Sequence, residues 1–357
     1  MIGHYGLSVI GTSHATQVGG ACQDAHAIRR LPEGWVVAAI ADGVGSASQS
    51  ATGARIASVV AVQTVEERCP PLWDAHVMSD VVEHAFHEAL RGVLREAERE
   101  GLPASEYDTT LTVVVYNGEH VVCGHVGDSG VVALKPTGDF ARITEAQKGE
   151  EHNTVVPLRA GPGSWVFRAL SEPVCGLLMM TDGILDVACP WILARTEQPV
   201  FVGYVRPFID ANVMKARSDA EFKQLEDEIA EFLSGDRSRL ISDDKTVVGL
   251  VNTEIVPEVK AVEYYEDPDW AELRRAHDQM LYGTGESPGP EAVISDEASG
   301  ETTAICVGSS DSTDGVANEG VAAESSPRKK VNLARRVWNS LFRWRRKRRH
   351  VDAGDGQ

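Results

Sequence analysis

The stretch AIADGVGSAS, residues 39–48, ends an apolar run with one acidic residue, Asp42, and follows it with Gly43 and Gly45. The residues before it, from Trp35 to Ile40, have the pattern of a short buried strand, and a Ser/Ala-rich segment with helical spacing follows. A carboxylate at the tip of a strand, beside a glycine whose carbonyl is open to close approach, suits a metal ion or a phosphate-bearing ligand. Taken alone, the Asp-Gly pair is more typical of a tight turn.

Composition limits the classes of protein to consider. The chain has 357 residues, a formal charge of −19 and 43% hydrophobic residues, enough for one large domain or two. Eleven Lys and Arg residues and no acidic ones lie in residues 328–349, so the acidic remainder disfavours general nucleic-acid binding. The six cysteines form no CxxC pair, which indicates a reducing cytosol and no structural zinc. We read no signal peptide and no apolar run near the ~20 residues that span a bilayer.

The order of the predicted elements indicates the fold class. Strands are expected in pairs and helices in pairs, rather than in strict alternation, which predicts an α+β fold with antiparallel sheets. The strand patterns lie at residues 7–15 (weakly), 24–31, 35–43, 109–118, 120–129, 130–138, 174–183 and 243–252, and the helical patterns at 46–67, 74–100 and much of 190–240. We expect a folded body at 1–255, a helical extension at 256–282, a disordered acidic linker at 283–327 and a basic amphipathic tail at 328–357.

Acidic residues recur at the ends of the predicted strands. They are Asp24, Asp42, Asp128, Asp182 and the Asp243-Asp244 pair. Each alone is explained by a turn or a strand cap, but together at one sheet edge they would repel one another unless a cation neutralised them. Ligands that are all oxygen favour Mg²⁺ or Mn²⁺ over zinc, and two such ions sharing a water lower its pKa to roughly 7. The pattern therefore predicts a two-metal site.

Six motifs in this order carry a family resemblance: CQDAHAI (22–28), AIADGVGS (39–46), DTTLTVVVY (108–116), GHVGDSGVVAL (124–134), MMTDGILD (179–186) and DDKTVVGL (243–250). Over about residues 5–252 the chain resembles the metal-dependent serine/threonine protein phosphatases of type 2C, the PPM family, and most of all its shorter bacterial members. The resemblance implies two stacked antiparallel β-sheets flanked by helix pairs, an α-β-β-α sandwich with its metals at one edge. It implies dephosphorylation of phosphoserine and phosphothreonine by a metal-bridging hydroxide.

The resemblance also implies the roles of single residues. Asp42 would bridge two Mn²⁺ or Mg²⁺ ions, with the Gly43 carbonyl on one of them. Asp182 and Asp243 would complete the first metal's shell, and Asp24 would hold water on the second. Asp128, together with Asp182, would take a third ion. Thr109 and Thr110 would support the site from beneath, and Asp244 would hydrogen-bond locally.

Three positions depart from the family pattern. Gln23 stands where a Glu is usual, Gly19 where an arginine grips phosphate, and Val44 where many eukaryotic members have a histidine acid. His14 is a candidate substitute acid beside the catalytic Asp42 and Asp182, the alternative being an ordinary hydrogen-bonded histidine. Arg159 and Arg168 lie where the family has a mobile flap, either as contacts to phosphate or as solvated charges. These departures keep a pseudophosphatase, which binds phosphoprotein without turnover, as the alternative function.

The tail has a helical pattern of its own. One face would carry Val331, Ala334, Val337, Trp338, Leu341 and Trp344, surrounded by Arg and Lys. Such a segment suits an anionic membrane surface, with nucleic acid, an acidic protein partner and the acidic body as rivals. We therefore expect a cytoplasmic protein, peripheral at the inner membrane surface, whose partners are a phosphorylated protein and its cognate Ser/Thr kinase.

Overall fold

The computed structural model describes residues 1–16, 20–147, 155–209, 216, 218–235, 238 and 240–282. The predicted linker at 283–327, the tail at 328–357 and Gly19 lie outside the described residues.

Within the described residues, ten strands form two antiparallel five-stranded sheets. The first sheet has the order β1-β10-β9-β6-β7 and the second β2-β3-β4-β5-β8. The strands of the first sheet are β1 (Ile2–Val9), β6 (Gly130–Leu134), β7 (Phe140–Arg142), β9 (Gly176–Met180) and β10 (Lys245–Asn252). Those of the second are β2 (Ala25–Arg30), β3 (Val36–Ala41), β4 (Leu111–Tyr116), β5 (Val121–Val126) and β8 (Val166–Leu170).

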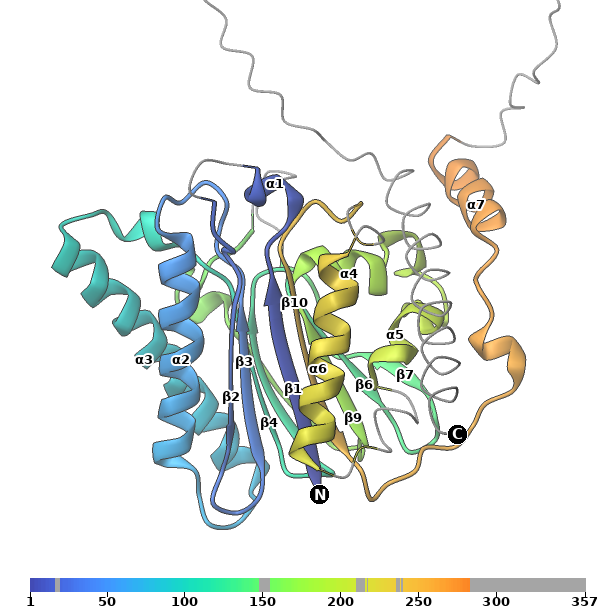
Figure 1. Cartoon of the computed structure of the whole chain (residues 1–357), viewed down its shortest axis with the longest axis horizontal. Helices are drawn as coiled ribbons and strands as arrows, with labels where there is room; N and C mark the ends of the chain where they lie inside the picture. The colour runs from blue at the N-terminus through green and yellow to red at the C-terminus, as the bar shows by residue number, and fades with distance from the viewer. Residues whose placement is uncertain are drawn as a thin grey trace, which may run out of the picture.

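Helices cover the outer face of each sheet (Figure 1). Helices α2 (Ser50–Arg68) and α3 (Ala75–Glu100) share one buried apolar cluster with the second sheet. Helices α4 (Asp182–Ala188), α5 (Val202–Ile209) and α6 (Asp219–Ser234) share another with the first sheet. A third cluster, which includes Ile40, Val114 and Leu177, fills the space between the sheets. The predicted α+β architecture of two stacked antiparallel sheets flanked by helices is confirmed.

The helix boundaries follow from local capping. The side chain of Asp74 accepts hydrogen bonds from two backbone N–H groups at the start of α3, and Gly101 ends that helix at φ 68°. Such a left-handed C-cap strongly favours glycine. At the start of α6, Ser218 Oγ accepts the Glu221 N–H at 3.3 Å, as the capping-box spacing predicts.

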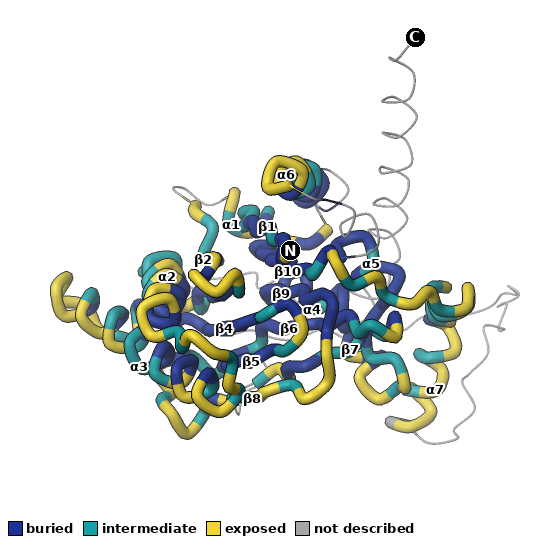
Figure 2. The backbone as a smooth tube through the Cα atoms, turned by 90° about the horizontal axis from the view of Figure 1, so that it is seen from below, coloured by how far each residue is buried: buried dark blue, intermediate teal, exposed yellow. Residues whose placement is uncertain are grey.

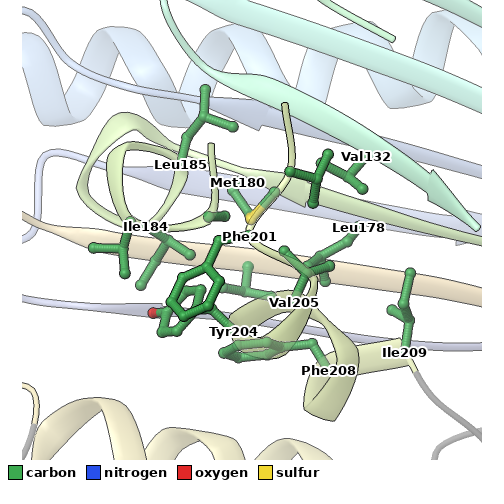
Figure 3. Packing of buried hydrophobic residues seen from close by; sticks show 14 of the residues in the cluster. Val132, Leu178, Met180, Ile184, Leu185, Phe201, Tyr204, Val205, Phe208 and Ile209 are labelled. Carbon is green, nitrogen blue, oxygen red and sulfur yellow. The ribbon is translucent and has the colours of Figure 1, made fainter. Parts of the chain in front are cut away.

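The core of the first sheet is apolar and closely packed. Figure 3 shows Leu178 and Met180 of β9 facing Phe201 and Tyr204, while Leu185 of α4 lies alongside. The two sheets therefore form a rigid support whose loops hold the polar residues. Figure 2 shows this arrangement as buried strands in the centre and exposed segments on the outer helices. None of the helices in the described part of the chain is long and apolar enough to cross a bilayer.

Three segments differ from their sequence patterns. The weak alternation over 7–15 predicts one strand, but β1 ends at Val9 and residues Thr12–Ala15 form the short helix α1. Strands β7 and β8 have no clear period-two pattern, and β8 is an edge strand with mostly exposed or half-buried side chains. Beyond β10, a 3-10 turn (Val262–Tyr265) and helix α7 (Trp270–Tyr282) pack against the first sheet's helices.

Candidate metal centre

The pairing register gathers the predicted acidic residues at one edge of the sandwich. In the first sheet, the end of β1 and the end of β9 lie beside the start of β10, so Asp182 and Asp243 come from adjacent strand ends. In the second sheet, the start of β2 pairs with the end of β3, which places Asp24 near Asp42. Asp128 lies in the loop between β5 and β6.

The Asp42-Gly43 turn is held by backbone contacts that allow no side chain at its second position. The Asp42 N–H donates to Thr110 Oγ1 at 2.9 Å, and the Asp42 carbonyl accepts from the Thr109 hydroxyl at 2.9 Å. The Gly43 N–H donates to the Gln23 carbonyl at 3.1 Å. A Cβ on Gly43 would lie 2.7 Å from Ser50 Cβ and 2.8 Å from the Gln23 oxygen. Gly43 is therefore required by close packing, whereas Gly45 has room for a side chain, and the threonines support the turn as expected.

Asp24 is buried and tied to the start of α4. The Thr181 hydroxyl donates to Asp24 Oδ2 at 2.7 Å, and the same hydroxyl oxygen accepts the Thr246 N–H at 3.0 Å. Burial raises the pKa of Asp24 to about 7, although the hydroxyl hydrogen bonds oppose this and the nearby Asp243 and Asp244 charges add to it. Asp24 is therefore a carboxylate that needs a positive neighbour to stay ionised.

Asp42 and Asp182 lie in the same electrostatic environment. Burial raises the pKa of each well above its ordinary value, and the charges of the other predicted ligands, including Asp128 and Asp243, raise it further. In the described part of the chain, no three His, Cys, Asp or Glu side chains stand close enough to form a finished metal site. The carboxylates instead repel one another across the edge.

The residues at this edge suit a hard divalent cation. The donors are carboxylate oxygens with a backbone carbonyl at Gly43, the set that Mg²⁺ and Mn²⁺ prefer. Gln23 adds an acceptor: its Oε1 is buried and has no hydrogen-bond partner among the residues that the structure describes. A buried oxygen left unpaired costs free energy unless water or an ion meets it. The unpaired amide oxygen and the mutually repelling carboxylates both fit a bound cation with its water.

Asp243 and Asp244 differ in what surrounds them. Asp244 is buried, and its two oxygens accept the Gly11 and Gln23 N–H groups, each at 2.6 Å. Asp243 is exposed, and its Oδ1 accepts the Asp244 N–H at 2.9 Å. Asp244 therefore hydrogen-bonds as predicted, but to distant segments: it fastens the end of β1 and the loop before β2 to the start of β10.

His14 also meets Asp244. It lies on α1 with 16% of its side chain exposed, and its Nδ1 is 3.0 Å from Asp244 Oδ2. Helix α1 therefore places His14 at the acidic edge, next to the Asp244 oxygen that also accepts the Gln23 N–H. Its role as an acid stays a prediction.

The two flap arginines both have protein partners. Arg159 forms a two-pronged pair with Asp108, with Nε–Oδ1 and Nη2–Oδ2 distances of 2.7 Å. Arg168 Nη1 lies 3.4 Å from the Ile143 carbonyl, and its Nη2 lies 3.5 Å from Glu145 Oε1. The Asp108 carbonyl also accepts the Val44 N–H, so the Arg159 pair adjoins the Asp42-Gly43 turn. No sequence pattern links Asp108 to Arg159, because the two lie 51 residues apart.

Comparisons with known proteins agree with this arrangement. The family model described as "Protein phosphatase 2C" matches residues 10–234. No curated protein matches the sequence. The crystal structure of a bacterial serine phosphatase aligns with 73% of this chain and with 100% of its own chain, at 12% identity and a TM-score of 0.50. The structure of a bacterial serine phosphatase with one arginine changed to lysine has a TM-score of 0.51, with the same identity and coverage. The catalytic domain of the phosphatase PstP, in complex with two manganese ions, covers 70% of this chain and 97% of its own, at 16% identity and a TM-score of 0.44.

The structural matches show a shared fold, and the family model covers more than half of the chain. The predicted family is confirmed: this chain belongs to the protein phosphatase 2C family.

Proposed function

We propose that the chain removes phosphate from phosphoserine and phosphothreonine in proteins and depends on Mn²⁺ or Mg²⁺. The observation that carries this proposal is the edge at which the strand ends bring Asp24, Asp42 and Asp182 together, one buried and two half-buried, so that desolvation and mutual repulsion raise the pKa of each. Such an arrangement is costly for folding and is typical of metal and catalytic sites. Membership of the phosphatase family supports the same reaction.

The roles we assign follow the sequence prediction. Asp42 would bridge two ions. The Gly43 carbonyl, Asp182 and Asp243 would bind the first ion, and Asp24 and the Gln23 amide would lie near the second. Asp128 and Asp182 would together bind a third ion. When bound, the ions would supply the positive charge that screens the phosphate and the acidity that makes water a nucleophile near neutral pH. Thr109 and Thr110 hold the Asp42 backbone in place, and Thr181 holds the Asp24 carboxylate, through the hydrogen bonds described above.

His14 is our candidate for the proton donor. With its Nδ1 facing the Asp244 carboxylate, a protonated imidazole would carry its second proton on Nε2 and would give it to the serine or threonine oxygen as that oxygen leaves. In this role His14 would replace the histidine that many family members have at the position of Val44.

The partners would be phosphorylated proteins and the Ser/Thr kinase that phosphorylates them. We place the protein in the cytoplasm, because the five cysteines within the described residues are all free thiols. If the basic tail is free to bind an anionic surface, the protein would lie near one. A pseudophosphatase is the second candidate. The uncharged Gln23 favours it, because it lowers the negative charge available to the second ion.

The test uses the full chain with p-nitrophenyl phosphate and a phosphothreonine peptide, assayed with Mn²⁺, with Mg²⁺ and with excess EDTA. Hydrolysis should require the metal, and Asp42→Asn should lower kcat by orders of magnitude because one change weakens both ion sites. Asp80→Asn, an exposed site on α3, is the matched control and should be unaffected. Full activity in EDTA or in Asp42→Asn would sink the two-metal proposal. Peptide binding without phosphate release would establish the pseudophosphatase.

A further inference from the structure

The segment after β10 is firmly attached to the body. The Trp270 and Phe201 rings meet edge to face with centroids 5.1 Å apart, and the guanidinium carbon of Arg206 lies 4.0 Å from the Tyr265 ring centroid. The Phe140 N–H donates to Tyr264 Oη at 2.8 Å. The surface between this segment and the body is therefore built from elements that are fixed to each other.

A groove of about 480 Å³ lies along this junction, bordered by the 3-10 turn at 191–193, the start of α5 and the N-terminal half of α7. Leu193, Val200 and Leu273 contribute apolar surface to it. Four exposed acidic residues also line it, namely Glu197, Glu266, Asp269 and Glu272. Among the described residues lining the groove, none is Lys or Arg. The groove thus offers an apolar floor with a purely acidic border, which suits a cationic ligand carrying bulky apolar side chains.

The same chain contains a segment with that chemistry. Residues 328–349 combine eleven Lys and Arg residues with Trp338, Leu341 and Trp344, and they include no Asp or Glu. Tryptophan and arginine are the side chains that most often dominate binding energy at protein interfaces. The chain leaves the described region at the end of α7, the helix that forms one wall of the groove.

Chain length does not prevent the two from meeting. The connecting residues 283–327 span up to ~3.3–3.6 Å each, a maximum reach on the order of 150 Å. A tethered ligand is present at an effective concentration in the millimolar range when its linker spans the sites, so even a weak interaction is populated.

We infer that residues 328–349 dock in the acidic groove of their own chain, with apolar side chains on its floor and the basic residues against Glu197, Glu266, Asp269 and Glu272. None of the predicted metal ligands lines this groove, so it would be a second binding surface. Anionic lipid and nucleic acid would compete for the same basic residues.

Photo-crosslinking of the full chain tests this inference. A benzoylphenylalanine in place of Phe342 leaves both tail tryptophans intact. After irradiation, mass spectrometry should find crosslinks to segments 193–202 and 264–276. Mixing isotope-labelled and unlabelled chains separates crosslinks within one chain from those between two. Raising the salt to 1 M, where the Debye length is ~3 Å, should reduce the yield with no substitution at all.

The groove variant Glu197→Lys with Glu272→Lys should lower the yield by about tenfold, because two attractions become repulsions. The matched control, Glu83→Lys with Glu98→Lys, makes the same change of net charge on α3, on the opposite side of the molecule from α7 (Figure 1). It should retain the yield within twofold. Equal losses in both variants would overturn a specific site, as would crosslinks elsewhere on the body or only between chains. Sedimentation with anionic vesicles without any intrachain crosslink would make lipid the tail's ligand and refute the inference.

Discussion

Replacing Asp244 by Asn should destabilise the protein strongly, whereas the same change at the neighbouring Asp243 should leave the stability almost unchanged. Both Asp244 oxygens accept backbone N–H groups at 2.6 Å, from Gly11 and Gln23, in a buried position. An asparagine has one acceptor oxygen, so its amide group would face the second N–H and leave that donor unpaired. A hydrogen bond to a charged group contributes about 1.5–3 kcal/mol, and the surviving bond becomes a neutral one, which gives a loss of about 2–4 kcal/mol. For a body of this size, that corresponds to a drop of roughly 4–8 °C in Tm.

The assay is urea unfolding and thermal melting in EDTA, so that metal binding does not contribute to the free energy of unfolding. Asp243→Asn keeps the Oδ1 that accepts the Asp244 N–H and lies at an exposed position, so its stability should stay within about 0.5 kcal/mol of the wild type. That variant should instead bind Mn²⁺ more weakly. Equal stability of the two variants would refute our division of this pair into a structural and a metal-binding carboxylate.

Gln23→Glu should lower the half-saturating Mn²⁺ concentration for phosphatase activity, because it adds a carboxylate near the second ion. The control Gln63→Glu, on the exposed face of α2, should leave this concentration unchanged. An unchanged concentration for Gln23→Glu would show that this residue does not lie near the ion. Burial lowers the pKa of His125 to about 4, so between pH 6.5 and 4 the unfolded chain gains a proton that the folded chain does not. As the pH falls through this window, stability should therefore decrease by up to about 3 kcal/mol relative to His125→Gln, and parallel unfolding profiles would contradict this. Gly53→Ala should lower Tm despite alanine's higher helix propensity, because the new Cβ would lie 2.1 Å from a backbone carbonyl oxygen. Gly92→Ala is the control: its new Cβ would meet only side-chain atoms, the nearest at 3.1 Å, so it should lower Tm less.

Local patterns in the sequence predicted much of the fold. Helix α3 has strong amphipathic spacing, an Asp74 N-cap and a Gly101 C-cap, and each of these acts within one or two turns. The Asn117-Gly118 pair likewise marks the hairpin between β4 and β5, with Gly118 at φ 103°. Strand β8 lacked such a signal, because an exposed edge strand need not alternate. The short helix α1 was also missed, since one turn is too short to set a period.

The site was predictable only where a local motif marks a residue. Asp-Gly after a buried strand marked Asp42 and Asp182, and the ordered motifs marked Asp24, Asp128 and Asp243. Contacts between distant segments gave no such signal. The pairing of Asp108 with Arg159 and the approach of His14 to Asp244 depend on the tertiary fold alone. The same holds for the acidic groove beside α7, whose walls come from separate parts of the chain.

The most direct test of the metal centre is a calorimetric titration of the metal-free full chain with Mn²⁺, alongside Asp42→Asn and the control Asp80→Asn. The wild type and the control should bind two ions or more per chain, with proton release as the buried carboxylates ionise. Asp42→Asn should lose both of the stronger sites, because its carboxylate would serve the two ions together. Absence of Mn²⁺ binding by the wild type, or binding that Asp42→Asn leaves unchanged, would contradict the account.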